Sequence, residues 1–107
     1  MPFVLVPRDL LCSYNMNVIT FDEAKRQINF DDHGIDIAAL ETFFDGDLLT
    51  REDRRVAYGE QRFQSVGWFG GEMLFVVWTP RHDDWPHLIS ARKADRHERE
   101  AWSRYLA

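Results

Sequence analysis

HLISARKADRHERE, residues 87–100, decides the fold, because a strand signal, a basic connection and a helix start follow one another in it without interruption. Residues 88–89 (LI) begin a short apolar run that predicts a buried strand, and residues 92–93 (RK) come where this run ends. Asp95 is followed three residues later by Glu98, which fits a capping box. The stretch therefore predicts a strand that leads directly into a helix.

Five basic side chains surround this predicted helix start: Arg92, Lys93, Arg96, His97 and Arg99. A helix N-terminus is already electropositive, so it disfavours further cations unless an anion is bound there. The cluster therefore indicates an anion-binding site. The alternative is an ordinary solvated strand end followed by an exposed helix.

Composition points to one domain with a real core. The chain has 107 residues, 45% of them hydrophobic, and its single cysteine, Cys12, excludes an internal disulfide. The net charge of −5 argues against a protein that binds nucleic acid over its whole surface, so any anion site must be local. No apolar run approaches the length of a membrane span, and residues 3–6 (FVLV) are followed at once by polar residues. We expect a cytoplasmic protein without membrane contact.

Residues 1–15 have no clear periodicity and precede a second methionine, Met16. We expect them to be an N-terminal extension of a single domain, residues 16–107. Their removal should then change the melting temperature little.

Two helices are expected next. The first follows a strand at residues 17–21 and runs from its N-cap, Asp22, to His33, where Gly34 supplies the left-handed residue that ends it. The second begins at Asp36. The expected buried faces comprise Phe21, Ala24 and Ile28 in the first helix and Ile37, Leu40, Phe43 and Phe44 in the second.

Residues 47–59 are mostly charged and polar, and residues 48–50 are the best strand candidate among them. A predicted hairpin follows this segment. Residues 62–69 alternate, Gly70-Gly71 makes a turn, and residues 73–79 are almost continuously apolar, which predicts a central strand covered on both faces. We expect the last helix to pack against the sheet through Trp102 and Tyr105. The element order predicts an α+β fold, with two N-terminal helices and a C-terminal helix packed on a mostly antiparallel sheet.

Familiar catalytic motifs are missing from the sequence: it has no phosphate-binding glycine loop, no nucleophile elbow and no HExxH. His82, Asp83, Asp84 and His87 lie in a proline-containing segment that gives no fixed ligand spacing. We therefore expect neither a metal nor a cofactor.

Three stretches together carry a resemblance to a known family: FDEAKRQINFDDHGI (21–35), GEQRFQSVGWFGGEMLFVVWT (59–79) and HLISARKADRHERE (87–100). They resemble the BrnT family of bacterial toxins, small RelE-like ribonucleases that pair with a BrnA-type antitoxin, over residues 17–105. The resemblance implies a RelE-like α+β fold, metal-independent RNA cleavage that inhibits translation, and neutralisation by an antitoxin. It also implies that DNA is contacted only indirectly, through the antitoxin.

The resemblance assigns site residues unevenly. Lys25, the His33-Gly34 pair, Arg62 and the Arg92-Lys93 pair stand where the family has equivalent residues. At two positions where the family usually has a basic residue, this sequence has Asp32 and His87. Both changes remove positive charge and weaken the case for RNA binding.

Cleavage of RNA without a metal needs three groups. One takes the proton of the attacking 2′-hydroxyl, cations stabilise the phosphate, and a donor protonates the leaving oxygen. We expect the catalytic residues to be Lys25, His33, Arg62 and Arg92, and the RNA-binding residues to be Lys93, Arg96 and His87.

Within this set, Arg62 and Arg92 would hold the phosphate with their planar forks, and His33 or His87 would transfer protons. Arg92 is expected to contribute little to folding. Each residue also has an ordinary structural explanation, for example His33 as a side chain that complements the C-terminus of its helix.

The alternative function is a non-catalytic module that keeps the fold and binds the antitoxin. Convergence of Arg62, Arg92, Lys93 and Arg96 in one cleft would favour the enzyme, and their separation would favour the module.

Overall fold

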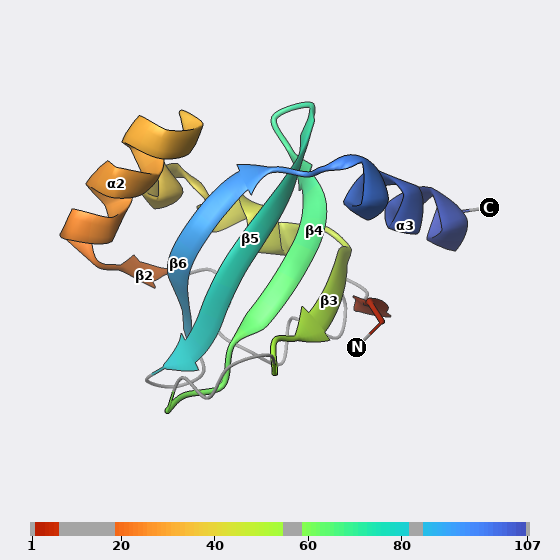
Figure 1. Ribbon diagram of the computed structural model, residues 1–107, viewed down its shortest axis with the longest axis horizontal. Helices are drawn as coiled ribbons and strands as arrows, with labels where there is room; N and C mark the ends of the chain where they lie inside the picture. Colours follow the sequence, from red (N-terminus) through yellow and green to blue (C-terminus); the bar gives the residue numbers. More distant parts are fainter. Residues whose placement is uncertain (1, 7–18, 55–58, 82–84, 107) are drawn as a thin grey trace.

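The computed structural model describes residues 2–6, 19–54, 59–81 and 85–106 of the chain. They form one six-stranded sheet with helices against it (Figure 1). The elements in chain order are β1 (Val4–Val6), β2 (Thr20–Phe21), α2 (Glu23–His33), the 3₁₀ helices η1 (Ile37–Ala39) and η2 (Glu41–Asp45), β3 (Leu48–Glu52), β4 (Phe63–Phe69), β5 (Glu72–Arg81), β6 (Trp85–Lys93) and α3 (Arg96–Leu106).

The sheet has the order β1-β3-β4-β5-β6-β2. Every neighbouring pair is antiparallel except the short β2, which runs parallel to β6 at one edge. The β4–β5 hairpin turns at Gly70 and Gly71, whose φ angles of 58° and 81° suit glycine and a turn that follows the sheet twist. The predicted α+β class and the predicted hairpin are confirmed.

Both faces of β5 are covered, as the apolar run predicted. Leu74, Val76 and Trp78 belong to a core beneath the 3₁₀ helices, whereas Met73 and Phe75 belong to a second core beneath α3. Helix α3 contributes Ala101 and Trp102 to the second core, so the predicted role of Trp102 is confirmed.

Tyr105 does not pack in this core. Its side chain is 45% exposed, and its hydroxyl donates to the backbone carbonyl of Phe3 over 2.8 Å. The prediction that Tyr105 packs into the core between α3 and the sheet is therefore wrong. Its hydroxyl instead ties α3 to the residue that precedes β1.

The expected second N-terminal helix is also wrong, because the segment forms two short 3₁₀ helices, η1 and η2. Ile37, Leu40 and Phe43 are nevertheless buried as predicted. They are spaced by three residues, and this spacing fits the three-residue turn of a 3₁₀ helix as well as it fits an α-helix. Within the described residues the two α-helices, α2 and α3, thus lie one on each side of the central strands in the chain order, and no second α-helix lies between α2 and β3.

Helix α2 has the predicted ends but not the predicted face. Asp22 caps it through the backbone N–H groups of Ala24 and Lys25, and Gly34 ends it at a φ of 71°. Ala24 is exposed and Ile28 is 59% exposed, so the expected apolar face is wrong.

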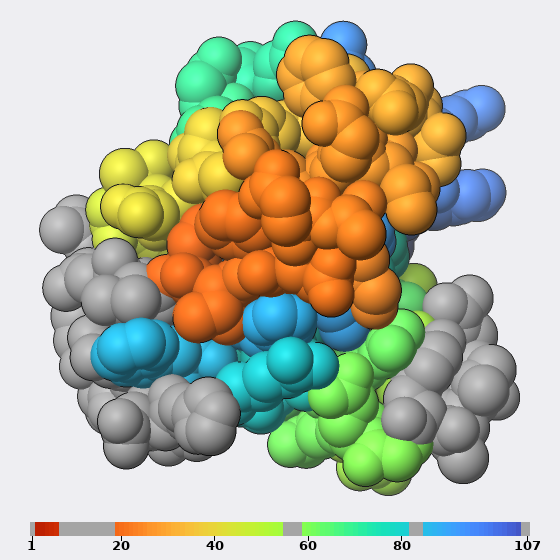
Figure 2. Space-filling model, turned by 90° about the vertical axis from the view of Figure 1, so that its left-hand side faces the viewer, coloured from red at the N-terminus to blue at the C-terminus, as the bar shows by residue number. Residues whose placement is uncertain are grey.

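The buried residue of α2 is Asn29, which is 4% exposed. Its Oδ1 accepts a hydrogen bond from the backbone N–H of Ala91 in β6, and its Nδ2 donates to the carbonyl of Ile35, both over 2.9 Å. Figure 2 shows α2, in orange, lying over β6, in blue. An amide, and not an apolar stripe, therefore fixes α2 at this edge of the sheet.

Part of the expected N-terminal extension lies within the sheet. Strand β1 pairs with β3, and Leu5 and Val6 pack against the two cores. The expected domain boundary at Met16 lies outside the described residues, so it stays a prediction. No helix in the described part of the chain is long and apolar enough to cross a membrane.

Candidate functional site

The predicted site residues divide between the two ends of the sheet. His87 pairs with Thr79 near the start of β6, and Arg62 comes immediately before Phe63, the first residue of β4, at the same end. Arg92 pairs with Phe75 five residues further along β6, a distance of roughly 16 Å at 3.3 Å per residue. Arg62 and Arg92 therefore do not converge on one phosphate.

The first group, here called the His87 cluster, comprises Lys25, Glu60, Arg62, Arg81 and His87. His87 is 9% exposed, and its Nδ1 lies 2.7 Å from Oγ1 of Thr20, the residue opposite it in β2. When Nδ1 carries the proton, it donates to Thr20 and leaves Nε2 as the proton acceptor. The pairing of β2 with β6 thus fixes the orientation of this ring.

Burial and neighbouring cations keep the His87 ring neutral. Burial lowers the pKa of His87 below its ordinary value, and the charges of Arg81 and Lys25 lower it further, whereas those of Glu60 and Asp22 oppose them. A histidine with a lowered pKa is unprotonated at neutral pH. His87 is therefore available as a proton acceptor.

Charges of both signs lie around His87: those of Arg81 and Lys25 and those of Glu60 and Asp22. Glu60 lies 3.6 Å from Arg62 and 3.3 Å from Arg81, so one carboxylate faces two guanidinium groups. The hydroxyl of Thr79 donates to the carbonyl of Gln61, which holds this segment beside β5. Lys25 adds a third positive charge near His87 from the first turn of α2.

The second group, here called the Arg92 cluster, comprises Arg92, Lys93, Arg96 and Glu98. Arg92 donates two hydrogen bonds of 2.8 Å to the two carboxylate oxygens of Glu98, and its guanidinium lies 4.0 Å from the centre of the Phe75 ring. The hydrogen bonds to Glu98 raise the pKa of Arg92. This arginine is committed to an internal ion pair.

Glu98 is the centre of that arrangement because it is only 5% exposed. It accepts from the backbone N–H of Asp95, while Asp95 accepts from the backbone N–H of Glu98, which confirms the predicted capping box and the start of α3. Removing Arg92 would leave a buried carboxylate without its cation. The Arg92–Glu98 pair therefore argues against the expectation that Arg92 contributes little to folding.

The other cations of this group are paired at the surface. Lys93 lies 3.6 Å from Glu72, and Arg96 lies 2.9 Å from Glu100 with its side chain 84% exposed. Each cation of the Arg92 cluster thus faces a carboxylate. Such exposed pairs contribute little to stability and hold their charges loosely.

His33 belongs to neither group. It lies exposed at the last position of α2, whereas Lys25 lies in the first turn of the same helix, roughly 12 Å away along its axis. The structure does not bring His33 to the His87 cluster.

Sequence reasoning missed Thr20, Glu60 and Arg81 as members of the site. The sequence position of Glu60 could have suggested its place in the site, because Glu60 stands two residues before Arg62 in the stretch that carries the family resemblance. Arg81 had none, because it lies beyond residues 73–79, the predicted strand, and the structure extends β5 to include it.

Among the described residues, no group of three or more histidine, cysteine, aspartate or glutamate side chains could hold a metal ion. Residues 82–84, part of the metal set considered above, lie outside the described residues.

Comparison with known proteins finds matches over most of the chain. The family model described as "Ribonuclease toxin, BrnT, of type II toxin-antitoxin system" matches residues 21–98. The 1.1 Å crystal structure of the Brucella abortus ribonuclease toxin BrnT is 30% identical, with a TM-score of 0.54 over 73% of this chain and 96% of that chain. Among curated protein sequences, none matches.

Proposed function

The chain belongs to the BrnT family of ribonuclease toxins of type II toxin-antitoxin systems, and on that premise we propose that it cleaves RNA with its own side chains, without a metal ion, and that a BrnA-like antitoxin neutralises it. Cleavage of cellular RNA would inhibit translation in the cytoplasm. The family match covers every residue of the His87 cluster. The non-catalytic alternative is not favoured.

The observation that carries this mechanism is the buried imidazole of His87 near Arg81 and Lys25, with Arg62 linked to Arg81 through Glu60. His87 would accept the proton of the ribose 2′-hydroxyl through Nε2, while Thr20 holds the other ring nitrogen. We propose His87 over His33 as the base, because His33 lies at the far end of α2 from the cations.

The cations of the cluster would stabilise the charge that develops on the phosphate. Arg62 and Arg81 can each offer two N–H groups to the phosphate oxygens, and Glu60 orients both guanidinium groups. Lys25 would supply a point charge near the 2′-oxygen. Preorganised positive charge of this kind usually supplies the largest share of such a rate enhancement.

Arg92, Lys93 and Arg96 would then serve a different part of the RNA. Arg92 holds the start of α3 through Glu98, and Lys93 and Arg96 lie exposed beside it. We propose that Lys93 and Arg96 exchange their surface carboxylates for RNA phosphates outside the cleaved bond. This assigns them to binding and the His87 cluster to chemistry.

The test is cleavage of RNA by the purified protein in excess chelator, together with growth after induced expression with and without the neighbouring antitoxin gene. We expect cleavage that does not depend on added metal, growth arrest by the toxin alone, and rescue by the antitoxin. Intact RNA and normal growth on expression of the toxin alone would refute the proposal. Loss of activity in chelator that a divalent ion restores would refute its metal-independent part.

A further inference from the structure

Thr79 is a polar residue in one of the most enclosed positions of the sheet. Its side chain is 1% exposed, near the end of the apolar run of β5. A buried hydroxyl is unfavourable unless it is hydrogen-bonded, and a valine of almost the same shape would avoid this cost. The hydroxyl of Thr79 donates to the backbone carbonyl of Gln61. This bond therefore explains why a hydroxyl is present at a site that valine would otherwise fill.

The register of the sheet places Thr79 between the proposed base and a proposed phosphate-binding arginine. On one side, Thr79 pairs directly with His87 of β6. On the other side, Phe63 pairs with Trp78, so the same register continued by one residue sets Arg62 beside Thr79. Residues opposite one another in neighbouring strands share a face of the sheet. Arg62 and His87 thus flank Thr79 in one row, roughly 10 Å apart at about 4.8 Å per strand.

The segment that carries Arg62 is attached to β5 in two ways. Thr79 binds the carbonyl of Gln61, and Arg81, two residues further along β5, lies 3.3 Å from Glu60. Arg81 is 45% exposed and Glu60 32% exposed, so this ion pair holds its side chains loosely. The bond from Thr79 engages the backbone itself, one residue before Arg62.

We propose that Thr79 is a positioning residue that, through the Gln61 carbonyl, sets the separation between the Arg62 guanidinium and the His87 imidazole. The inference rests on the proposed ribonuclease function, in which His87 accepts the 2′-hydroxyl proton and Arg62 stabilises the phosphate. Both groups must reach the same ribose-phosphate unit, and a displacement of about 1 Å can lower a rate on the order of a hundredfold. Thr79 needs no contact with RNA, because it acts through Arg62.

Thr79→Val tests this role, because it removes the hydroxyl and keeps the shape of the side chain. It should lower kcat for RNA cleavage about tenfold or more and change KM less than about twofold, because the cations that bind RNA remain while their placement in the transition state is lost. Thr79→Ser keeps a hydroxyl and should retain kcat within about threefold of the unsubstituted protein. Thermal melts define a temperature at which every variant is folded.

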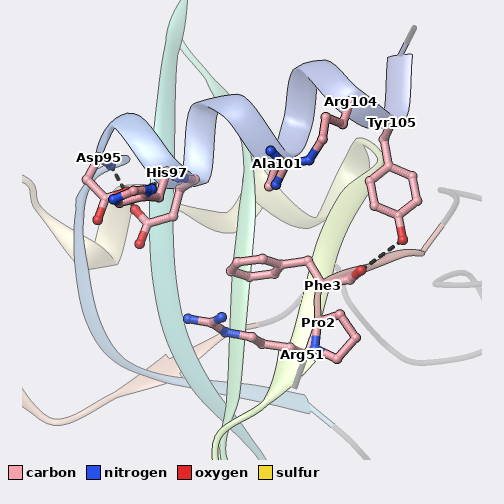
Figure 3. Close-up of a pocket in the computed structure, with 9 residues that line it drawn as sticks. Pro2, Phe3, Arg51, Asp95, His97, Ala101, Arg104 and Tyr105 are labelled. Carbon is pink, nitrogen blue, oxygen red and sulfur yellow. Dashed lines mark hydrogen bonds between the residues drawn. The ribbon is translucent and has the colours of Figure 1, made fainter.

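Tyr105→Phe is the matched control. The hydroxyl of Tyr105 also donates to a backbone carbonyl, that of Phe3, over 2.8 Å (Figure 3). Phe3 precedes β1, which lies at the opposite edge of the sheet from β2. Tyr105→Phe should therefore leave kcat and KM within about twofold of the unsubstituted protein. An equal fall of kcat in Tyr105→Phe and Thr79→Val would overturn the proposal, because loss of any such bond would then lower activity.

A double-mutant cycle tests whether Thr79 acts through Arg62. In the Arg62→Ala background, Thr79→Val should lower kcat less than about twofold further, because the group that Thr79 positions is already gone. Equal losses in the two backgrounds would overturn the proposal, and so would full activity of Thr79→Val. Thr79→Ala repeats the test without a methyl group against the Gln61 carbonyl. Failure of both variants to fold would overturn it as well, because the hydroxyl would then serve the fold itself.

A measurement without RNA separates this inference from the ribonuclease function. Nε of Arg62 is buried, so its proton is shielded from water and its NMR resonance can be assigned by its absence in Arg62→Lys. The resonance should move in Thr79→Val and stay in place in Tyr105→Phe. If it moves in a protein that cleaves no RNA, the cleavage proposal fails and the hold of Thr79 on Arg62 stands. A resonance unmoved in Thr79→Val would overturn the positioning role in an active protein and an inactive one alike.

Discussion

The two basic groups of this protein differ in how their charges are balanced. In the Arg92 cluster each cation faces a carboxylate, and the central pair, Arg92 with Glu98, is partly buried. In the His87 cluster one carboxylate, Glu60, faces two guanidinium groups beside a buried imidazole. In the first arrangement each cation has a carboxylate of its own, whereas in the second two guanidinium groups share Glu60.

The difference teaches that clustering of cations in a sequence does not by itself locate an anion site. HLISARKADRHERE is the most basic-looking stretch of the chain, yet its Arg92 holds a capping glutamate. The residues of the His87 cluster come from four separate segments and meet only through the sheet.

The largest effect should follow removal of the proposed base. His87→Ala should lower the rate of RNA cleavage by about a hundredfold or more, the scale of general base catalysis. His33→Ala, which changes the histidine that matches the family but lies outside the cluster, should lower it less than about tenfold. Single-turnover cleavage of one RNA measures both, and a larger loss in His33→Ala would reverse the assignment.

The second effect is on stability and tests the other cluster. Arg92→Ala should lower the free energy of unfolding by about 2 kcal/mol, because it leaves Glu98 buried without a cation; partial exposure of Arg92 keeps the loss below that of a fully buried pair. Urea unfolding measures it. Adding Glu98→Gln to Arg92→Ala should recover part of the loss, and an unchanged midpoint in Arg92→Ala would show that the pair does not stabilise the fold.

A smaller effect concerns pH. Burial and the charges of Arg81 and Lys25 lower the pKa of His87, so the neutral, active form should persist below pH 6.5 and the acidic limb of kcat/KM should lie there. Lys25→Ala removes one of the charges that lower the pKa, and the acidic limb should move to higher pH. A limb that stays in place would indicate that the base is another group.

The smallest effect should follow loss of an exposed pair. Arg96→Ala breaks only the surface contact with Glu100 and should change the free energy of unfolding by less than about 0.5 kcal/mol. The comparison with Arg92→Ala in the same urea series is the measurement. Equal losses in the two variants would mean that burial of Glu98 is not the cause.

Local signals in the sequence predicted the elements that depend on local chemistry. The capping box of Asp95 and Glu98, the Gly70-Gly71 turn and the buried β5 are set by neighbouring residues, and all three are confirmed. Apolar spacing alone misjudged the segment after Gly34, because a spacing of three residues does not distinguish 3₁₀ from α-helix.

The arrangement of the site depended on contacts between distant residues. The contacts of Arg92 with Phe75 and of His87 with Thr20 are set by the register of β5 with β6 and of β2 with β6, which no local pattern reveals. The role of Asn29 was missed for a related reason, because a polar residue on a helix is usually exposed and its bond to Ala91 spans 62 residues of chain.

That hydrogen bond has a consequence for the protein in a crowded solution. Beyond Leu88, no described strand pairs with the outer side of β6, and an edge of this kind has backbone donors to which a strand of another chain could add, a common route to aggregation. The amide of Asn29 occupies the donor of Ala91, and the body of α2 covers the edge beside it. Intermolecular strand pairing is thereby blocked along this edge for as long as α2 remains in place.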